Sequence, residues 1–171
     1  MIKKILIVSD SHGNSSYVKT AIDRENPDMF IHLGDVQGDT EQMRRWLGDS
    51  VPAVFIEGNC DRYGGRDLKQ VSVFELNGHR FFCTHGHRQG VSLGIQNLIY
   101  SAMENECDIA LYGHTHVPLD DIYEGFGDVG GGVRVLNPGS IALPRGGSEK
   151  SYIVMTFDEN EDYEVELKSL R

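Results

Sequence analysis

Short apolar runs alternate with amphipathic segments through the first third of the chain, and this alternation restricts the fold more than any other feature. Residues 5–8, 29–33 and 54–56 are the apolar runs, and each is the length of a strand buried on both faces. Residues 15–22 and 40–47 carry apolar residues at helical spacing. The β-α-β-α-β order predicts a parallel sheet with right-handed crossovers.

The remaining two thirds predict shorter strands and one more helix. An Asn77-Gly78 pair between two β-rich runs predicts a hairpin over residues 71–83. A helix is expected within residues 93–104. Further strands are expected at residues 109–112, 151–157 and 163–167. The helix at residues 40–47 is expected to begin with Thr40 as its cap, and the first helix with a cap among residues 14–16. The simplest packing is one α/β domain over residues 1–171, with two mixed sheets and the helices outside.

Charge and cysteine content narrow the class of protein. The formal net charge is −10, which argues against a nucleic-acid polymer or an anionic membrane as the main partner, because both bind basic surfaces. Three cysteines without a paired framework favour a reducing compartment. The apolar run at residues 5–8 is too short for the core of a signal peptide, and no stretch approaches a membrane span. We therefore expect a soluble, cytoplasmic protein.

Polar residues follow five of the expected strands at their carboxyl ends. The motifs are Asp10-Ser11-His12, Gly34-Asp35, Gly58-Asn59-Cys60-Asp61, His85-Gly86-His87 and Gly113-His114-Thr115-His116. Ligands of open α/β sheets bind at this edge. Five of the seven histidines lie in these motifs. Each motif alone is commonly an ordinary turn, so the interpretation depends on their conjunction.

The spacing within two motifs predicts convergence. Residues two apart in an extended segment point the same way, so Asp10 with His12, and His114 with His116, can each reach one point. Nitrogen and oxygen ligands suit Mn²⁺, Fe²⁺, Co²⁺, Ni²⁺ or Zn²⁺. The other two histidines, His32 and His79, are interpreted as structural.

Taken in order, these motifs resemble the calcineurin-like metallophosphoesterases. The strings SDSHGN, HLGD, GNCD, THGH, YGHTH and NPGSIALPR resemble those of the small bacterial and archaeal phosphodiesterase branch, over residues 5 to about 157. The resemblance implies a four-layer α-β-β-α sandwich with two divalent transition-metal ions. Manganese is the first choice of metal, with nickel, cobalt, iron or zinc as alternatives. The resemblance to this family also implies a homodimer or a larger homo-oligomer.

The resemblance also implies a ligand set. One metal site would be Asp10, His12, Asp35 and His116, and the other Asp35, Asn59, His85 and His114. Asp35 would bridge the ions, and a hydroxide between them would attack phosphorus. The catalytic residues would be Asp35, Asn59, His85 and His114. The charges of two divalent ions, two aspartates and one hydroxide sum to plus one, which favours a small phosphodiester over a monoester dianion. A phosphomonoesterase or nucleotide hydrolase with the same site, and a non-catalytic scaffold of the same fold, are the alternatives.

Several residues beside the ligands are candidates for contacting the substrate or supporting a ligand. They are Cys60, Asp61, Arg62 and His87. For Arg62 and Arg88 a phosphate contact and an ordinary surface charge are equally good interpretations, whereas Arg66 is better explained as surface charge.

Cys60 stands where larger relatives usually carry a histidine, the expected acid for the leaving group. A neutral thiol is a weak donor, so substrates with good leaving groups would be favoured. A second hypothesis starts from the spacing C-x₅-R between Cys60 and Arg66, which is typical of a cysteine phosphatase loop. Asp61 argues against it because a neighbouring carboxylate raises the pKa of a thiol.

Overall fold

Two five-stranded mixed sheets form the centre of the computed structural model, which describes residues 1–61, 67–124 and 131–171. The first sheet has the order β10-β9-β1-β2-β3 and the second the order β4-β5-β6-β8-β7. The first sheet contains β1 (Lys4–Val8), β2 (Met29–His32), β3 (Ala53–Phe55), β9 (Ser151–Phe157) and β10 (Tyr163–Ser169). The second contains β4 (Val71–Leu76), β5 (His79–Thr84), β6 (Ile109–Leu111), β7 (Leu119–Tyr123) and β8 (Val133–Asn137).

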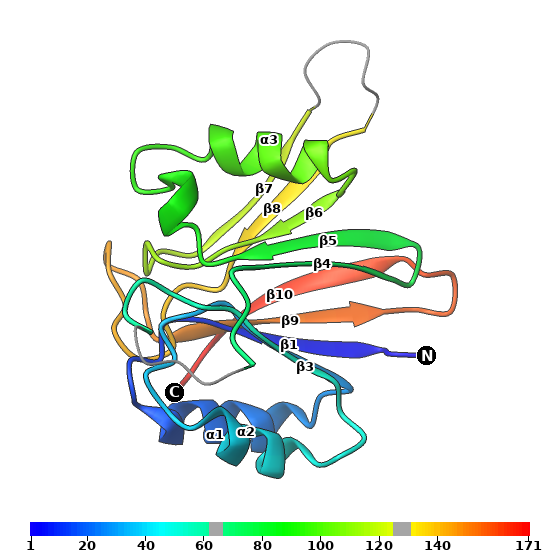
Figure 1. Cartoon of the computed structure of the whole chain (residues 1–171). Coiled ribbons are helices and arrows are strands. Elements are labelled where there is room, and N and C mark those ends of the chain that lie inside the picture. The colour runs from blue at the N-terminus through cyan, green and yellow to red at the C-terminus, as the bar shows by residue number, and fades with distance from the viewer. Residues whose placement is uncertain (62–66, 125–130) are drawn as a thin grey trace.

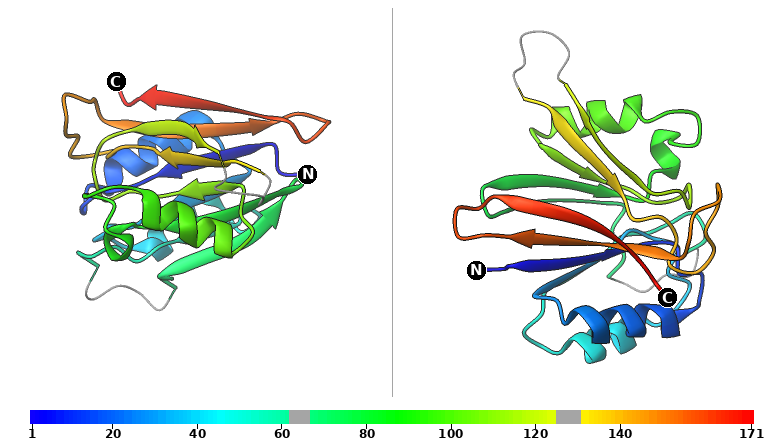
Figure 2. Two further views of the ribbon diagram at one scale, coloured as in Figure 1. Left: turned by 90° about the horizontal axis from the view of Figure 1, so that it is seen from above. Right: turned by 180° about the vertical axis from the view of Figure 1, so that it is seen from behind.

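Helices cover the outer face of each sheet. The helices α1 (Ser15–Glu25) and α2 (Thr40–Leu47) lie on the first sheet, and α3 (Gln96–Glu104) lies on the second (Figure 1). The view from behind shows the same four layers (Figure 2, right). The predicted four-layer α/β sandwich is therefore confirmed. Strands β1, β2 and β3 are parallel as predicted, and β9 joins β1 antiparallel, which makes the sheet mixed.

The continuous apolar run of β1 is explained by burial on both faces. Ile5 and Ile7 belong to the core between the two sheets, whereas Leu6 and Val8 belong to the core beneath α1 and α2. All four side chains are fully buried. A third apolar cluster fills the space between the second sheet and α3. Three stacked cores hold the ends of β1 and its neighbours rigidly, which is what a site at those ends requires.

The local predictions for turns and helix ends are confirmed in part. Asn77 and Gly78 both have positive φ, 49° and 77°, as a two-residue hairpin turn of type I′ requires. The prediction of Thr40 as a cap was wrong. Asp39 is the cap residue, and its carboxylate accepts from the main-chain N–H of Gln42. The helix expected from residue 93 begins only at Gln96, because Gly94 has a φ of 152° that no helix accommodates.

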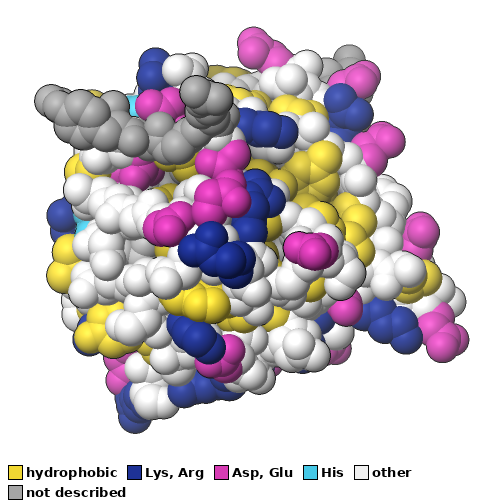
Figure 3. Space-filling model, turned by 60° about the horizontal axis from the view of Figure 1, so that its bottom comes forward, with side chains coloured by type: hydrophobic (Ala, Val, Ile, Leu, Met, Phe, Trp, Pro, Cys, Tyr) yellow, Lys and Arg dark blue, Asp and Glu magenta, His cyan; other side chains and the backbone are white. Residues whose placement is uncertain are grey.

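Both signs of charge are interspersed on the face that α1 and α2 cover (Figure 3). Lys19 and Asp23 on α1 illustrate this, since they form an ion pair one helical turn apart. Among the described residues, no helix combines the length and the apolar character that crossing a bilayer demands.

Candidate metal centre

Loops from both sheets bring the predicted side chains to one edge of the sandwich. Asp10 and His12 follow β1, Asp35 follows β2 and Asn59 follows β3 in the first sheet. In the second sheet His85 follows β5, and His114 and His116 follow β6. Within each sheet these strands run parallel to one another, so their carboxyl ends meet. All seven residues predicted as metal ligands lie in this one cluster.

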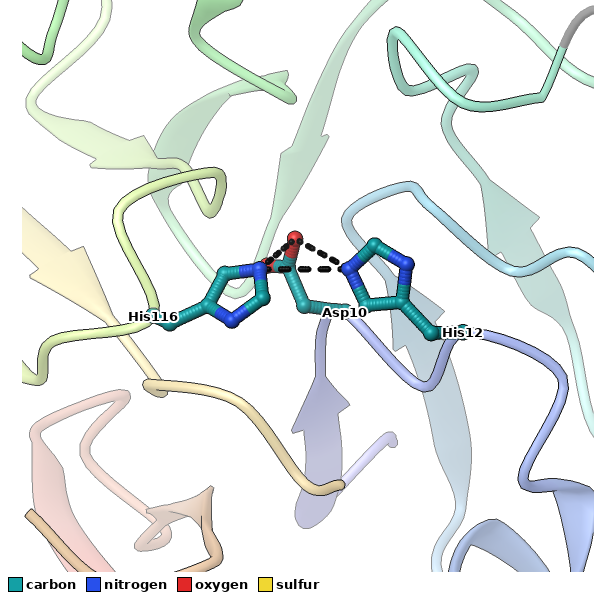
Figure 4. Close-up of side chains that lie close together, drawn as sticks. All are labelled: Asp10, His12 and His116. Atoms are coloured by element: carbon teal, nitrogen blue, oxygen red, sulfur yellow. Dashed lines mark hydrogen bonds and ion pairs between the residues drawn. The ribbon is translucent and has the colours of Figure 1, made fainter. Parts of the chain in front are cut away.

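The first group of ligand atoms consists of Asp10, His12 and His116. Their side chains point toward one another from opposite sides of the first strand's end (Figure 4). Oδ1 of Asp10 lies 3.1 Å from Nε2 of His116 and 3.7 Å from Nε2 of His12. The two Nε2 atoms are 3.2 Å apart. These three atoms are close enough to hold one metal ion.

The second group is arranged around Asp35, His85 and Asn59. Oδ2 of Asp35 lies 3.4 Å from Nε2 of His85 and 3.6 Å from Nε2 of His12, so this carboxylate stands between the two groups. Oδ1 of Asn59 lies 3.1 Å from Nε2 of His85 and 3.1 Å from Nδ1 of His114. Asp10, Asp35 and His85 also form a group of atoms close enough to hold an ion. The Asp35 carboxylate is therefore within reach of both groups.

Hydrogen bonds at the far side of three rings determine which nitrogen faces the cluster. Nδ1 of His85 lies 2.7 Å from the carbonyl oxygen of Leu33, and Nδ1 of His116 lies 2.6 Å from that of Leu143. Nδ1 of His12 lies 2.7 Å from Oε1 of Gln37. An oxygen of this kind only accepts, so each Nδ1 donates, and each neutral ring turns the lone pair of Nε2 inward.

The inward-facing atoms are acceptors that need a cation. The Nε2 atoms of His12 and His116 cannot hydrogen-bond to each other as neutral rings, and two lone pairs at 3.2 Å repel. Oδ1 of Asp10 is fully buried and has no hydrogen-bond partner in the described part of the chain. A buried charged oxygen costs free energy unless it is paired with another group or coordinates a metal. The residues present therefore fit a metal ion, and two carboxylates with imidazole ligands suit a divalent transition metal.

The two carboxyl groups of the cluster, Asp10 and Asp35, both have a lowered pKa. Burial alone would raise the pKa of Asp10, but His116, His85 and the Ser9 hydroxyl outweigh it, and the pKa is lowered. The pKa of Asp35 is lowered strongly against the same burial by its contacts with His85 and the main-chain N–H of Cys60. Both carboxylates are therefore anionic at neutral pH. Burial lowers the pKa of His32 to about 4, so this histidine stays neutral, consistent with a structural role.

The backbone of the cluster is left-handed at most ligand positions. Asp10, His12, Asp35, His114 and His116 all have φ between 45° and 69°. Non-glycine residues adopt this region rarely, and such residues concentrate at functional sites. The predicted reason for their convergence, that residues two apart point the same way in an extended segment, was therefore wrong. Asp10 and His12 do converge, but through a tight left-handed turn rather than along a strand.

The other candidate residues lie around the cluster with different partners. Cys60 is exposed beside Asp35, and partial burial and this carboxylate raise the pKa of its thiol, which disfavours a nucleophilic thiolate. Asp61 is buried and accepts from the main-chain N–H groups of Val36, Gln37 and Gly58, which ties two ligand loops together. Arg62 and Arg66 lie outside the described residues.

His87 lies against the second group of ligands. Its ring centroid is 5.4 Å from that of His85 and 6.1 Å from that of His114. Its Nδ1 is buried and has no hydrogen-bond partner among the described residues. The position is close enough for a supporting or substrate-contacting role.

Two serines that were not among the predicted site residues orient the ligands. Oγ of Ser9 donates to Oδ2 of Asp10 at 2.5 Å. Oγ of Ser140 donates to the carbonyl oxygen of Asp10 and accepts from the N–H of Leu143, whose own carbonyl holds His116. One buried hydroxyl thus links two ligands of the first group. Ser140 lies in the string NPGSIALPR, but 130 residues separate it from Asp10, and no local spacing indicates the contact.

Comparisons with curated proteins point to one family. The chain matches the calcineurin-like phosphoesterase superfamily domain over residues 4–160. It is 31% identical over 156 residues to "Probable metallophosphoesterase YsnB" of Bacillus subtilis (strain 168), covering 90% of this chain and 84% of the relative. It is 26% identical over 176 residues to "Phosphodiesterase YfcE" of Escherichia coli (strain K12), covering 91% of this chain and 88% of the relative.

Solved structures agree on the fold. A conserved Streptococcus pneumoniae TIGR4 protein, described as a predicted phosphoesterase, is 32% identical with a TM-score of 0.79, covering 99% of this chain and 91% of that one. Wild-type Vps29 of Entamoeba histolytica, complexed with Zn²⁺, is 18% identical with a TM-score of 0.69, covering 98% and 99% of the two chains. At that identity the likeness shows the fold alone. The family model, the first curated relative and the cluster of aspartates and histidines together show that this chain belongs to the calcineurin-like phosphoesterase superfamily.

Proposed function

We propose that this chain is a phosphodiesterase that uses two divalent transition-metal ions, with manganese as the first choice. The observation that carries the proposal is the position of Asp35, whose Oδ2 lies within 3.6 Å of His12 in one ligand group and 3.4 Å of His85 in the other. A shared carboxylate between two groups of inward-facing acceptors is the arrangement that a pair of cations requires.

The chain's own residues would position the ions and leave one side open to the substrate. Asp10, His12, Asp35 and His116 would hold one ion, and Asp35, Asn59, His85 and His114 the other. When bound, the ions supply Lewis acidity to the phosphoryl oxygens and acidify a water molecule. Asp10 and His85 are fully buried and support the floor of the site, whereas Asn59 is exposed and His114 is half-buried at its mouth.

The charge of the ligand set favours a diester over a monoester. Only Asp10 and Asp35 are anionic among the proposed ligands, so two divalent cations would remain partly uncompensated. A modest excess of positive charge suits the single negative charge of a phosphodiester. A phosphomonoesterase or nucleotide hydrolase would use the same ligands with more cationic side chains near the phosphate, and Arg62, a candidate for that role, lies outside the described residues.

A non-catalytic scaffold of the same fold is the alternative from another functional class. All seven proposed ligand positions are filled by aspartate, asparagine or histidine in this chain, and the structure brings them within contact of one another. A scaffold has no need to keep buried acceptors facing each other, because this arrangement destabilises the protein without a cation. The filled and converging site therefore favours an enzyme.

Removal and return of metal tests the proposal directly. The protein is treated with a chelator, dialysed, and assayed on bis(p-nitrophenyl) phosphate with and without Mn²⁺, Ni²⁺ or Co²⁺. We expect no hydrolysis without metal and recovery with Mn²⁺. Because the ions bind the folded state, Mn²⁺ at about 100 times its dissociation constant should stabilise the fold by about 2.7 kcal/mol, measured by thermal unfolding.

The same experiment separates the competing functions. Activity that survives chelation and disappears on alkylation with iodoacetamide would support the cysteine phosphatase hypothesis for Cys60. Stabilisation by metal without hydrolysis of any diester or monoester would support the scaffold. Faster hydrolysis of p-nitrophenyl phosphate than of the diester would support the monoesterase.

Substitution of Cys60 by histidine tests the role of the missing acid. Main-chain N–H of Cys60 donates to Oδ1 of Asp35 at 2.8 Å, so residue 60 is held beside the shared ligand. A histidine there can protonate a leaving alkoxide. The substrate is an alkyl p-nitrophenyl phosphodiester, and the reaction of interest is the cleavage that releases its alkoxide. We expect Cys60→His to raise kcat for this cleavage by about 100-fold, the low end of the effect of general acid catalysis. Product analysis measures which bond is cleaved.

Cys60→Ala is the matched control, because it removes the thiol without adding an acid. It should leave the ratio of the two cleavage products as in the unmodified chain. An unchanged ratio in Cys60→His would show that protonation of the leaving group does not limit the slow substrates.

A further inference from the structure

A groove outside the second sheet lies between η1 (His87–Gln89) and the helix α3. Its volume is about 760 Å³, and we call it the η1–α3 groove. Its lining combines one cation, one carboxylate, one aromatic ring, one thioether and several amide or hydroxyl groups. The residues include Arg88 and Gln89 from η1, and Asn97, Tyr100, Ser101 and Met103 from α3. Such a mixture of apolar surface with a few placed polar groups is typical of sites for small organic ligands.

The short helix η1 connects the groove to the metal centre. His85 ends the loop from β5, and η1 starts two residues later with His87. The His87 ring stands 5.4 Å from His85 and 6.1 Å from His114, measured between ring centroids. Arg88 is the next residue along the chain and lines the groove. A molecule whose reacting phosphate lies at the metal centre can therefore extend past His87 into the groove.

Arg88 is unusual among the arginines of the described chain. Five of the eight form ion pairs with carboxylates, and Arg24 donates to main-chain oxygens. Arg88 and Arg145 have neither kind of partner among the described residues. An exposed guanidinium without a carboxylate, in a chain with a net charge of −10, is available to an external anion. Arg88 is the one of these two that lines the groove.

The lining also orients a ligand along the groove. Glu104 lines the groove on α3 and repels an anionic group, so an anion is favoured at Arg88, on the side of the metal centre. Tyr100 and Met103 offer apolar surface for a planar ring. Gln89 and Asn97 carry amides that can donate and accept hydrogen bonds. A phosphate followed by a planar base with polar edges, which is a nucleotide, satisfies this order.

We propose that the η1–α3 groove binds the non-reacting half of the substrate, and that this half is a nucleotide with a phosphate of its own, held by Arg88. The proposal rests on the proposed phosphodiesterase function and specifies its substrate class as short 5′-phosphorylated oligonucleotides. The reacting diester lies at the metal centre, the terminal phosphate lies at Arg88, and the base of that nucleotide lies against Tyr100.

The test compares two dinucleotides that differ only in the terminal phosphate. Values of kcat/KM are measured for pApA and ApA with the manganese-loaded protein. We expect a preference for pApA of about tenfold, which is the size of a charge-assisted contact at an exposed site. Arg88→Gln should reduce this preference to about twofold or less, and Tyr100→Leu should raise KM for both dinucleotides.

Arg145→Gln is the matched control. Its guanidinium is the other one without a partner among the described residues, and its main-chain N–H donates to the carbonyl oxygen of His116, which belongs to the first group of ligand atoms. We expect this variant to keep the pApA preference. Equal loss of the preference in both variants would place the phosphate outside the groove and overturn the proposal.

Two further outcomes would also overturn it. One is equal kcat/KM for pApA and ApA in the unmodified chain. The other is a preference that Arg88→Gln leaves unchanged. Hydrolysis of bis(p-nitrophenyl) phosphate separates failure of the groove proposal from failure of the proposed function. If the protein cleaves this diester but neither dinucleotide, it is a phosphodiesterase and the groove does not bind a nucleotide. If the protein cleaves none of the three substrates, both the phosphodiesterase function and the groove proposal are wrong.

Discussion

The Asp35→Asn variant is expected to lose at least about 1000-fold in kcat/KM on an activated diester, while its fold remains intact. The amide has the shape of the carboxylate, and its oxygen can still accept from the N–H of Cys60, as Oδ1 does at 2.8 Å. Its NH₂ group, however, replaces the charged oxygen that lies between His12 and His85. Loss of a shared anionic ligand removes the electrostatic stabilisation of both cations, and effects of this kind are among the largest in catalysis.

Metal content is the second measurement on this variant. Elemental analysis should find two ions per unmodified chain and fewer than two in Asp35→Asn. Asp23→Asn is the control, because Asp23 is exposed on α1 and, within the described part of the chain, pairs only with Lys19 on the surface. Full occupancy by two ions together with normal kcat/KM in Asp35→Asn would show that this carboxylate is not shared between them.

The Gly58→Ala variant is expected to be destabilised by about 1–3 kcal/mol and to lose most of its activity. A methyl group at Gly58 would collide with the side chain and the main-chain nitrogen of Asp35. The backbone of Gly58 is not left-handed, so the cost comes from the close approach of two ligand loops rather than from its own conformation. Overpacking of a rigid, buried site costs this much because its neighbours cannot move freely.

Gly38→Ala provides the matched control for this substitution. Gly38 lies in the loop that follows Asp35 and also lacks a left-handed conformation, but a methyl group there meets its nearest atom at an ordinary 3.5 Å. Urea unfolding and kcat/KM should be close to those of the unmodified chain. If Gly58→Ala is as stable and active as Gly38→Ala, then the loop of Asn59 does not hold the shared carboxylate in place.

The order of strands and the chemistry at their ends were predictable because both depend on local patterns. A run such as residues 5–8 is apolar without interruption because its two faces are buried against different layers, and this leaves a signal in consecutive residues. The Asn77-Gly78 turn is predictable for a similar reason, since few residues adopt positive φ at both positions. The resemblance to the family motifs also identified which aspartate, asparagine and histidine residues are the expected metal ligands.

Helix boundaries were less predictable, because several residues compete for each one. Asp39 and Thr40 are both good caps, and only the bond from Gln42 N–H shows which of them is used. The start of α3 depends on Gly94, whose φ of 152° interrupts a segment with helical spacing. At both helix starts, one local backbone conformation or hydrogen bond decides the boundary, whereas the helical preferences of the residues do not.

The sequence by itself determined which elements form, which strand ends carry ligands and which family the motifs resemble. Only the tertiary structure decided how the ligands face one another, because His12 and His116 meet across 104 residues and Ser140 reaches Asp10 across 130. Local periodicity says nothing about contacts between distant segments. It also misses the left-handed turns at Asp10 and Asp35, since those conformations cost free energy that the packed loops around them offset.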